Sequence, residues 1–317
     1  MRAVLYATLA RADLVKKLGA ILGDDLTVVD DAEALAAAMP EAEALFVGDM
    51  LLVGKAADAV YQKGGKLKWI QILTAGYDNV KKHGAPNGAQ VTNVGDALAP
   101  GVGLHALSLL LTLQRQVPAY VKNQDNHGWD RSAAAKMTTP IGQTAVVLGF
   151  GHIGREIARL MRALGSHVIG VSRTGAADAG ADEMLPFSRI GEAVGRADSI
   201  FVSLPLDAAT HHLFNASLLS QCRKNAVLVN IARGGLIDQI ALTDALKAGT
   251  IAGAALDVTD PEPLPPEHPL WDAPNLYISP HCAGAAGALT TERISDKAAE
   301  NLKRYIAGEA LADVVKL

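Results

Sequence analysis

The stretch Gly149-Phe150-Gly151-His152-Ile153-Gly154 decides the fold of this chain. It follows an apolar run at residues 144–148 and opens a helix-like segment at 153–164, behind which a second apolar run covers 167–171. A glycine-rich turn between a strand and a helix, followed by another strand, is typical of a nucleotide-binding βαβ unit. The first glycine permits the turn, the second lets a pyrophosphate approach the backbone, and the third allows helix and strand to pack closely. The cofactor contacts predicted in this turn are Gly149, Gly151, His152, Ile153 and Gly154.

The end of the next strand selects the cofactor. A site for NAD usually carries Asp or Glu there, because a carboxylate binds the ribose 2′-hydroxyl. Here the chain reads Ser172-Arg173-Thr174, and the nearest downstream acid, Asp178, lies beyond Gly175. A guanidinium flanked by two hydroxyls suits a 2′-phosphate. We therefore expect Ser172, Arg173 and Thr174 to bind NADP(H) in preference, with NAD(H) possible if Arg173 is an ordinary surface residue.

Strand and helix patterns alternate in two separate stretches of the chain. The first set of β-rich runs covers 4–6, 27–29, 45–47, 69–73 and 91–93, with helical patterns such as 31–39 and 55–62 between them. The second set covers 145–148, 167–171, 200–204, 226–230, 251–256 and 276–278. Such alternation predicts parallel sheets covered by helices on both faces, and hence two doubly wound α/β domains.

The last amphipathic segment, about 289–306, comes too late to extend the second sheet, and we expect it to return to the first domain. The predicted fold is therefore a Rossmann nucleotide-binding domain, residues 99–284, inserted in a discontinuous flavodoxin-like substrate domain made of residues 1–98 and 285–317.

Composition narrows the function classes. Half of the 317 residues are hydrophobic, and 29 basic against 33 acidic residues give a net charge of -4. Nucleic-acid binding by bulk positive charge is excluded, because neutralising phosphates needs clustered Lys and Arg. The two cysteines, Cys222 and Cys282, are too few for a disulfide framework or a thiolate zinc site. We expect a cytoplasmic protein without a metal.

Two segments invite a membrane interpretation. Residues 3–10 are apolar, but Arg11 and Asp13 end the run, so a first strand entering a helix is favoured over a signal peptide. The 18 residues between Asp96 and Arg115 carry no charge, which is about the length of a membrane span. We interpret this stretch as a linking helix with its start at Pro100 and Gly101, buried between the domains and against a second subunit, with no bilayer required.

Three polar residues follow strand ends of the second domain. Arg233 lies past the run at 226–230, Glu262 past 251–256, and His281 past 276–278. Ligands of open α/β sheets bind outside the carboxyl ends of the strands, so these side chains should converge. Arg can hold a carboxylate by two parallel hydrogen bonds, and His can protonate a carbonyl oxygen while a nearby Glu orients it. Taken singly, each is more often an ordinary surface or turn residue.

Together with these residues, the chain resembles the D-isomer-specific 2-hydroxyacid dehydrogenase family over nearly its whole length. The signatures that carry the resemblance are 142–158, 230–238, 253–258, Glu262-Pro263-Leu264 and Ser279-Pro280-His281, in that order and spacing. The resemblance implies reduction of 2-oxo acids to (R)-2-hydroxy acids by NADH or NADPH. It implies that Arg233 binds the substrate carboxylate and carbonyl, that His281 is the acid/base, and that Glu262 partners His281.

The resemblance also implies further binding residues. Asp257 would help hold the nicotinamide amide, and the backbone at Ala232 and Gly284 would line the same ring. We also expect cofactor contacts around the end of the strand run at 200–204, namely Leu204, Pro205 and Thr210. In the first domain the loop after residue 73 would receive the substrate carboxylate on its backbone N–H groups, and its expected substrate contacts are Thr74, Ala75, Gly76 and Tyr77. The family implies a homodimer formed through about residues 100–127.

The chain departs from the family pattern at two positions. Many members carry Glu before the histidine of the linking helix, where this chain has Leu104 followed by His105. Many carry an aromatic residue where this chain has Thr259. We interpret His105 as a structural residue, and of the acids Asp260 and Glu262 we assign the histidine partner to Glu262.

The sequence does not identify which 2-oxo acid is the substrate. A small 2-oxo acid of the glyoxylate or hydroxypyruvate type is the first choice, and a bulkier one such as an arylpyruvate is the alternative. Because the sequence ends at Leu317, we expect no additional regulatory domain of the kind that some phosphoglycerate dehydrogenases carry. A different class, a non-catalytic nucleotide-sensing co-regulator, is distinguished by whether substitution of Arg233 and His281 abolishes turnover.

Overall fold

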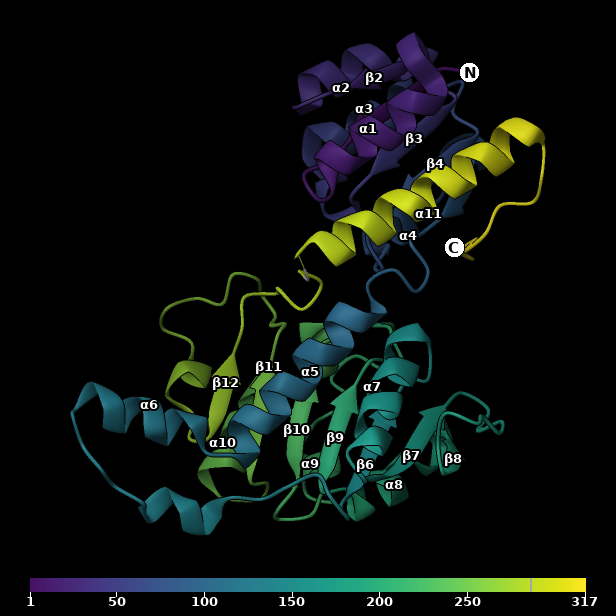
Figure 1. Ribbon diagram of the computed structural model, residues 1–317. Coiled ribbons are helices and arrows are strands. Elements are labelled where there is room, and N and C mark those ends of the chain that lie inside the picture. The colour runs from purple at the N-terminus through teal and green to yellow at the C-terminus, as the bar shows by residue number, and fades with distance from the viewer. Residues whose placement is uncertain (286) are drawn as a thin grey trace. The chain divides into compact units, whose positions relative to one another are not determined.

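The computed structural model describes residues 1–285 and 287–317, which form two compact units (Figure 1). One unit consists of Met1–Leu98 with Ala286–Leu317, and the other is Ala99–Ala285. The chain therefore leaves the first unit, completes the second, and returns.

The first unit contains a parallel five-stranded sheet with the order β2-β1-β3-β4-β5. Its strands are β1 (Ala3–Tyr6), β2 (Leu26–Val28), β3 (Ala44–Val47), β4 (Trp69–Ile72) and β5 (Gln90–Thr92). Its helices are α1 (Arg11–Leu22), α2 (Ala32–Ala38), α3 (Gly54–Lys63), α4 (Asp78–His83) and α11 (Gly287–Ala307). This is the flavodoxin-like strand order, and right-handed crossovers assign α1 to one face of the sheet and α2 and α3 to the other.

The two faces of β4 show how the sheet of the first unit is packed. Ile70 and Ile72 belong to the apolar core with residues of α2 and α3. Trp69 and Gln71 alternate with them, as side chains do along a strand, and face α11, which packs beside α1. The aromatic ring of Trp69 stacks on Tyr305 of α11 with centroids 5.2 Å apart.

A buried chain of hydrogen bonds joins α11 to the sheet of the first unit. Trp69 Nε1 donates to Thr92 Oγ1 over 2.9 Å, and Thr92 Oγ1 donates to Gln71 Oε1 over 2.9 Å. Asn301 Nδ2 of α11 donates to the same Gln71 oxygen over 2.9 Å. Asn301 also exchanges hydrogen bonds with the backbone of Ala312, which fixes the segment after the helix. Because Asn301 is only 1% exposed, each of these groups depends on the others for a partner.

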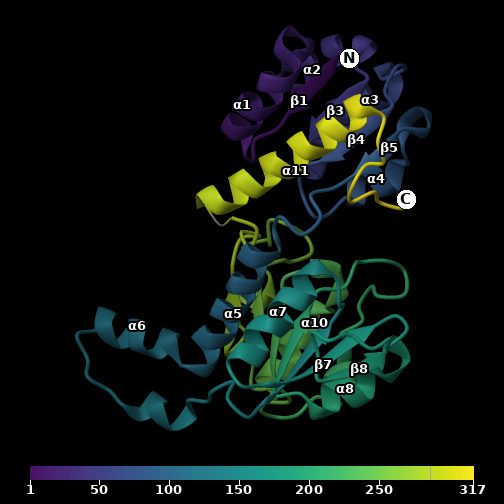
Figure 2. The ribbon, with the colours of Figure 1, turned by 45° about the vertical axis from the view of Figure 1, so that its right-hand side comes forward.

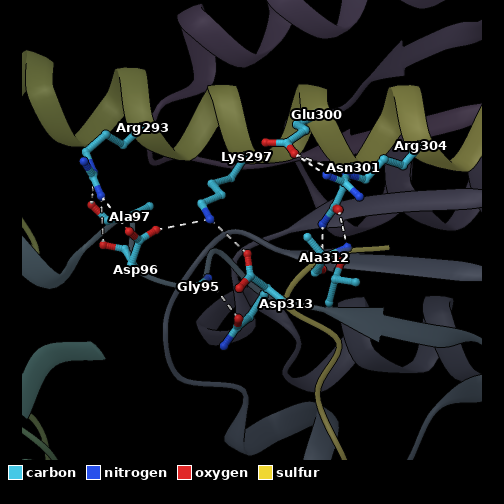
Figure 3. Close-up of polar contacts among 12 residues, drawn as sticks. Gly95, Asp96, Ala97, Arg293, Lys297, Glu300, Asn301, Arg304, Ala312 and Asp313 are labelled. Carbon is cyan, nitrogen blue, oxygen red and sulfur yellow. Dashed lines mark hydrogen bonds and ion pairs between the residues drawn. The ribbon is translucent and has the colours of Figure 1, made fainter. Parts of the chain in front are cut away.

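An ion cluster on the same face of α11, closer to the start of the helix, holds the segment that leads to the second unit (Figure 3). Arg293 donates to the backbone oxygen of Ala97 over 3.2 Å and pairs with Asp96 over 3.2 Å. Lys297 lies 3.2 Å from both Asp96 and Asp313, so the helix, the outgoing segment and the C-terminal segment share one cation. These charges are neutralised within the cluster, which suits their partial burial.

The second unit contains a parallel seven-stranded sheet with the order β12-β11-β10-β9-β6-β7-β8. Its strands are β6 (Thr144–Leu148), β7 (His167–Ser172), β8 (Glu183–Pro186), β9 (Ser199–Val202), β10 (Val227–Asn230), β11 (Gly253–Leu256) and β12 (Leu276–Ile278). Its helices are α5 (Ala99–Gln114), α6 (Val117–Asp125), α7 (His152–Ala163), α8 (Ile190–Arg196), α9 (Ala216–Leu219) and α10 (Gln239–Lys247). Strand order reverses between β6 and β9, as in a Rossmann fold.

Helices cover both faces of the second sheet. On one face α8, α9 and α10 enclose an apolar core that includes Leu148, Val202 and Leu228. On the other face α5 packs on α7, β10 and β11, which explains why the uncharged stretch is buried. Figures 1 and 2 show that α6 stands away from the sheet. Among the residues that the structure describes, no helix is both long and apolar enough to span a bilayer.

The predicted fold class, two doubly wound parallel-sheet domains, is confirmed, and one strand was missed. β8 is an edge strand paired only with β7. It begins with Glu183 and ends with Pro186, so it lacks the apolar run that identified the other strands. Proline is tolerated in this position because an edge strand leaves one row of backbone groups unpaired. The predicted linking helix is α5, and the segment of about residues 100–127 expected to form the dimer contact comprises two helices, because Gln116 adopts a left-handed backbone conformation between α5 and α6.

Replacing Asn301 by Ala should destabilise the first unit. The substitution removes two hydrogen bonds to Ala312 and leaves Gln71 Oε1 with one donor fewer in a buried site, which typically costs about 1–3 kcal/mol. Hydrogen exchange of peptides covering β4 and β5 should become faster. Lys303→Ala, at an exposed position of the same helix, is the control. Equal exchange in the two variants would show that the buried network does not stabilise the sheet.

Candidate active site

The predicted cofactor and catalytic residues of the second unit lie at one edge of its sheet. All seven strands are parallel, so their carboxyl ends share that edge. The glycine-rich turn follows β6, Arg173 follows β7, Arg233 follows β10, and His281 follows β12. β6 pairs with β7 on one side and with β9 on the other, which makes this edge the switch point where open α/β sheets bind ligands.

The glycine-rich turn is held tightly against β9. A Cβ atom on Gly154 would lie 2.0 Å from the backbone oxygen of Gly149, and a Cβ atom on Gly149 would lie 2.5 Å from that of Ser203. Ser203 Oγ in turn donates to the Gly149 oxygen over 2.7 Å. These contacts leave no room for a side chain at either glycine, so both are required by packing within the protein.

Gly151 is different, because a Cβ atom there would meet no protein atom within 4 Å. It precedes α7, whose first turn has no side-chain cap. Gly151 and His152 are exposed and Ile153 is half-buried. An open space in front of uncapped N–H groups suits a pyrophosphate, which gains from both the donors and the helix dipole. The residues present therefore fit a dinucleotide.

The end of β7 offers a cation and no available carboxylate. Arg173 is exposed and makes no hydrogen bond or ion pair with any other described residue. Asp178 accepts from the Gly180 N–H at 2.9 Å and from Arg155 at 2.9 Å, and these partners lower its pKa. Ser172 Oγ accepts from the Gly175 N–H and Thr174 Oγ1 from the Ala176 N–H, so the turn around Arg173 is ordered.

The loop after β9 is closed by its own hydrogen bonds. Thr210 is buried, and its hydroxyl donates to the Pro205 oxygen over 2.8 Å and accepts from the Asp207 N–H over 2.8 Å. The hydroxyl is thus engaged in shaping the loop. Leu204 is half-buried and Pro205 exposed, which leaves their surfaces as the parts of this loop available to a cofactor.

Arg233 sits on a turn that a buried amide fixes. Asn230 at the end of β10 is fully buried, donates to the Arg233 oxygen over 2.9 Å, and accepts from the Ala232 N–H over 3.1 Å. The Arg233 guanidinium is half-buried, and its Nη1 donates to the Ala232 oxygen over 2.6 Å. The backbone that carries the cation is therefore rigid.

The structure brings His281 and Glu262 together. Nδ1 of His281 lies 2.8 Å from Glu262 Oε2, while Glu262 Oε1 accepts from the Thr259 N–H over 3.1 Å. The carboxylate therefore has both oxygens occupied and cannot rotate freely. A His whose Nδ1 faces a carboxylate carries a proton there and turns Nε2 outward. The other candidate acid, Asp260, has its backbone joined to the side chain of Gln239.

Asp257 anchors the loop that carries His281. Its carboxylate is 1% exposed and accepts from Ser279 Oγ at 2.6 Å, from the Cys282 N–H at 3.0 Å and from the Ala283 N–H at 2.9 Å. Burial raises the pKa of the Cys282 thiol, and the negative charge of Asp257 raises it further. The thiol therefore stays protonated at neutral pH. Both Asp257 oxygens thus accept hydrogen bonds from the chain itself. Ala232 is buried, and Gly284 is half-buried directly after this loop.

The predicted substrate loop belongs to the first unit and follows β4. Thr74 Oγ1 donates to the Gly76 oxygen over 2.9 Å, and Asn93 Nδ2 donates to the Ala75 oxygen over 3.1 Å. The carbonyl oxygens of Ala75 and Gly76 therefore both accept hydrogen bonds. The N–H groups of the same two residues have no acceptor among the described residues. Tyr77 is half-buried and directly precedes α4. Successive free N–H groups are a receptor for an anion.

Sequence reasoning missed residues that support the site from behind. Asn230 interrupts an otherwise apolar strand, and this polar residue in a buried run was the available signal. Ser279 lies inside a quoted signature without an assigned role, and its hydroxyl reaches Asp257, 22 positions earlier in the chain. His105 was assigned a structural role, and the structure shows its imidazole beside Ser279 and Asp257.

Comparison with known proteins gives a consistent set of relatives. Residues 107–283 match the family model described as D-isomer specific 2-hydroxyacid dehydrogenase, NAD binding domain. The chain is 35% identical over 308 residues to a D-3-phosphoglycerate dehydrogenase of Mycobacterium tuberculosis, an alignment covering 94% of this chain and 56% of that protein. The chain thus spans little more than half the length of these relatives. It is 30% identical over 260 residues to a glyoxylate reductase of Korarchaeum cryptofilum, covering 81% and 78% of the two chains.

Solved structures agree with this over almost the full length. A D-isomer specific 2-hydroxyacid dehydrogenase family protein from Aeromonas salmonicida is 30% identical, with a TM-score of 0.87 and 99% of each chain covered. A D-isomer specific 2-hydroxyacid dehydrogenase from Xanthobacter autotrophicus, solved with NADPH and MES, is 26% identical, with a TM-score of 0.82 and coverage of 99% and 98%.

The two glycines of the turn should respond differently to a methyl group. Gly151→Ala should keep its stability, because the Cβ atom enters open space, but should weaken dinucleotide binding about 10-fold or more by blocking the backbone. Gly154→Ala should destabilise the second unit by about 1–3 kcal/mol, the usual range for an overpacked site. Thermal unfolding and dinucleotide titration measure the two effects. Unchanged binding by Gly151→Ala would remove the turn from the cofactor site.

Proposed function

Because the chain belongs to the D-isomer specific 2-hydroxyacid dehydrogenase family, we propose that it reduces a small 2-oxo acid to the (R)-2-hydroxy acid with NADPH. The observation that carries this proposal is the His281–Glu262 pair, 2.8 Å apart, at the sheet edge that also carries Arg233 and the glycine-rich turn. A proton donor with an orienting carboxylate and a guanidinium for an anionic substrate are the groups that reduction of a 2-oxo acid needs.

The residues would divide the work as follows. Arg233 binds the substrate carboxylate and carbonyl through its planar fork of N–H donors. His281 protonates the carbonyl oxygen from Nε2, while Glu262 accepts the hydrogen bond from Nδ1 and stabilises the charged imidazole that precedes this transfer. The cofactor, when bound, supplies the hydride that the carbonyl carbon receives. The hydrogen of the product hydroxyl group would therefore come from His281.

The cofactor would be held by the residues around the sheet edge. Gly149, Gly151, His152, Ile153 and Gly154 accommodate the pyrophosphate, and Ser172, Arg173 and Thr174 the 2′-phosphate. The remaining contacts that we assign are Leu204, Pro205, Thr210, Ala232, Asp257 and Gly284. The free guanidinium of Arg173 and the commitment of Asp178 to Arg155 favour NADP(H) over NAD(H). The NADPH in the Xanthobacter structure is consistent with this preference.

The substrate would be a small acid of the glyoxylate or hydroxypyruvate type. The archaeal relative named glyoxylate reductase supports this class. We assign Thr74, Ala75, Gly76 and Tyr77 of the first unit as further substrate contacts, since the free N–H groups of Ala75 and Gly76 suit a carboxylate.

Dimerisation through α5 and α6 is part of the proposal. Leu104 of α5 and Val117 and Val121 of α6 expose apolar surface, and Trp129, beyond the end of α6, is 94% exposed. Exposed apolar side chains gathered on one segment are characteristic of a protein contact.

Steady-state assays with 2-oxo acids test the activity and the roles together. With NADPH, glyoxylate or hydroxypyruvate should give the highest kcat/KM among glyoxylate, hydroxypyruvate, phenylpyruvate and 3-phosphohydroxypyruvate. His281→Gln should lower kcat about 100-fold or more, because general acid catalysis contributes that much. Glu262→Gln should lower it about 10- to 100-fold, whereas Asp260→Asn, an exposed neighbouring acid, should stay within about twofold.

Three outcomes of these assays would change the conclusion. A preference for phenylpyruvate or for the phosphorylated acid would reassign the substrate. Equal losses in Asp260→Asn and Glu262→Gln would remove the orienting role from Glu262. No turnover of any acid with either dinucleotide would contradict the enzyme and favour a nucleotide-sensing co-regulator.

Replacing Arg173 by Ser should reduce the preference for NADPH. Charge-assisted hydrogen bonds typically contribute about 1.5–3 kcal/mol, so KM for NADPH should rise about 10- to 100-fold while KM for NADH changes by less than about threefold. Arg159→Ser, which removes a guanidinium paired with Glu156 on α7, is the matched control. A higher kcat/KM with NADH than with NADPH in the unmodified protein would contradict the assignment of Arg173.

A further inference from the structure

The loop that carries His281 is attached to β12 at its start and to Asp257 by hydrogen bonds. It leaves β12 after Ile278, and its residues 279–283 return to Asp257. Ser279, Cys282 and Ala283 donate to the Asp257 carboxylate, and the His281 N–H donates to the Asp257 backbone oxygen over 2.8 Å. His281 itself adopts a left-handed backbone conformation, φ 49°, which is unfavourable for a residue with a side chain. Its side chain is 48% exposed and is held by Glu262. The orientation of the imidazole therefore depends on how firmly the loop is anchored.

His105 reaches this anchor from a different element. It lies on α5, which packs on β10 and β11. Its Nε2 atom is 3.0 Å from Ser279 Oγ and 3.2 Å from Asp257 Oδ1, while its side chain is 24% exposed. The three groups come from α5, from the end of β11 and from the end of β12, so they join elements that are distant in sequence.

The hydrogen-bond directions in this group follow from the chemistry of its members. Ser279 has one hydroxyl proton, which it donates to Asp257 over 2.6 Å. A carboxylate offers only acceptors, and the Ser279 oxygen is left as an acceptor toward His105. A lone pair on Nε2 would therefore face two acceptors within 3.2 Å, whereas an N–H there satisfies both. His105 is thus a donor at Nε2.

We propose that His105 is a positioning residue for the reaction, which acts through Ser279 and Asp257 on the loop that holds His281. Its N–H donor keeps the Ser279 hydroxyl turned to Asp257 and supplies this buried carboxylate with a donor from outside the loop. The inference rests on the proposed function, since it assigns to His105 a role in placing the proton donor of that reaction. His105 itself contacts neither substrate nor cofactor in this role.

The test compares variants that keep or remove the donor. His105→Leu and Ser279→Ala break the contact, His105→Gln retains an N–H donor, and Ser279→Thr retains the hydroxyl. The controls are His167→Leu, an exposed histidine at the start of β7, and Ser108→Ala, whose hydroxyl bonds only to the Leu104 oxygen of its own helix. Thermal unfolding of all variants establishes that they fold.

The first measurement is hydrogen exchange of the free protein, which requires no turnover. The amides of Cys282 and Ala283 are protected by Asp257, so a loosened anchor exposes them. His105→Leu and Ser279→Ala should exchange these amides about 10-fold faster than the unmodified protein, with His105→Gln and Ser279→Thr in between or unchanged. Peptides covering β6 and α7 should exchange as before.

The second measurement is turnover, with a double-mutant cycle. His105→Leu should lower kcat about 10- to 100-fold, the usual cost of losing a supporting hydrogen bond behind a reacting group, while KM and dinucleotide affinity stay within about threefold. In a His281→Gln background, His105→Leu should have no further effect on kcat, because its influence passes through His281. A merely structural residue would lower the rate equally in both backgrounds.

The outcomes separate this inference from the proposed function. If the unmodified protein turns over and His105→Leu keeps kcat within about twofold, the inference is wrong and the function stands. Unchanged exchange at Cys282 and Ala283 in His105→Leu also overturns it, whatever the activity. If exchange accelerates but the unmodified protein reduces no 2-oxo acid, then the proposed function fails, and with it the catalytic part of the inference.

Discussion

The parallel pairing of β6 with β7 on one side and β9 on the other is the constraint on which the second unit depends. The later strands are added outward from β6 on both sides. Because all of them are parallel, their carboxyl ends lie at the same edge of the sheet. A turn of three glycines, two arginines and the His281–Glu262 pair therefore meet there, although they span more than 130 positions between Gly149 and His281. The close approach of Gly154 to Gly149 is what allows α7 to begin directly at this edge.

What could be predicted from the sequence is what local patterns determine. The glycine spacing, the apolar runs and the strand-end positions of Arg233 and His281 each depend on neighbouring residues, and they led to the correct fold class. The edge strand β8 was missed because most of its residues are only half-buried, so they need not be apolar. The contact of His105 with Ser279 joins positions 174 residues apart, and no local pattern encodes which side chains two packed elements bring together.

Acidic residues illustrate how environment separates residues of one type. Asp178 is committed to Arg155, Asp257 to the loop after β12, and Glu262 to His281. Asp260 is exposed, and its backbone is the part that Gln239 holds. At the family position of a glutamate, Leu104 is 58% exposed on α5, while the following His105 supplies the polar contact inward. What each carboxylate can do in the site therefore depends on its hydrogen-bond and ion-pair partners more than on its residue type.

The return of α11 to the first sheet has a consequence for synthesis of the chain. Trp69 and Gln71 of β4 lack their contacts with α11 until Tyr305 and Asn301 are synthesised. Roughly 200 residues separate Leu98 from Asn301, which at about 5–20 residues per second takes about 10–40 s on the ribosome. The inserted unit is contiguous in sequence, so it has all of its strands once β12 is made, before Asn301 is reached. The first unit is thus begun before the inserted unit and completed after it.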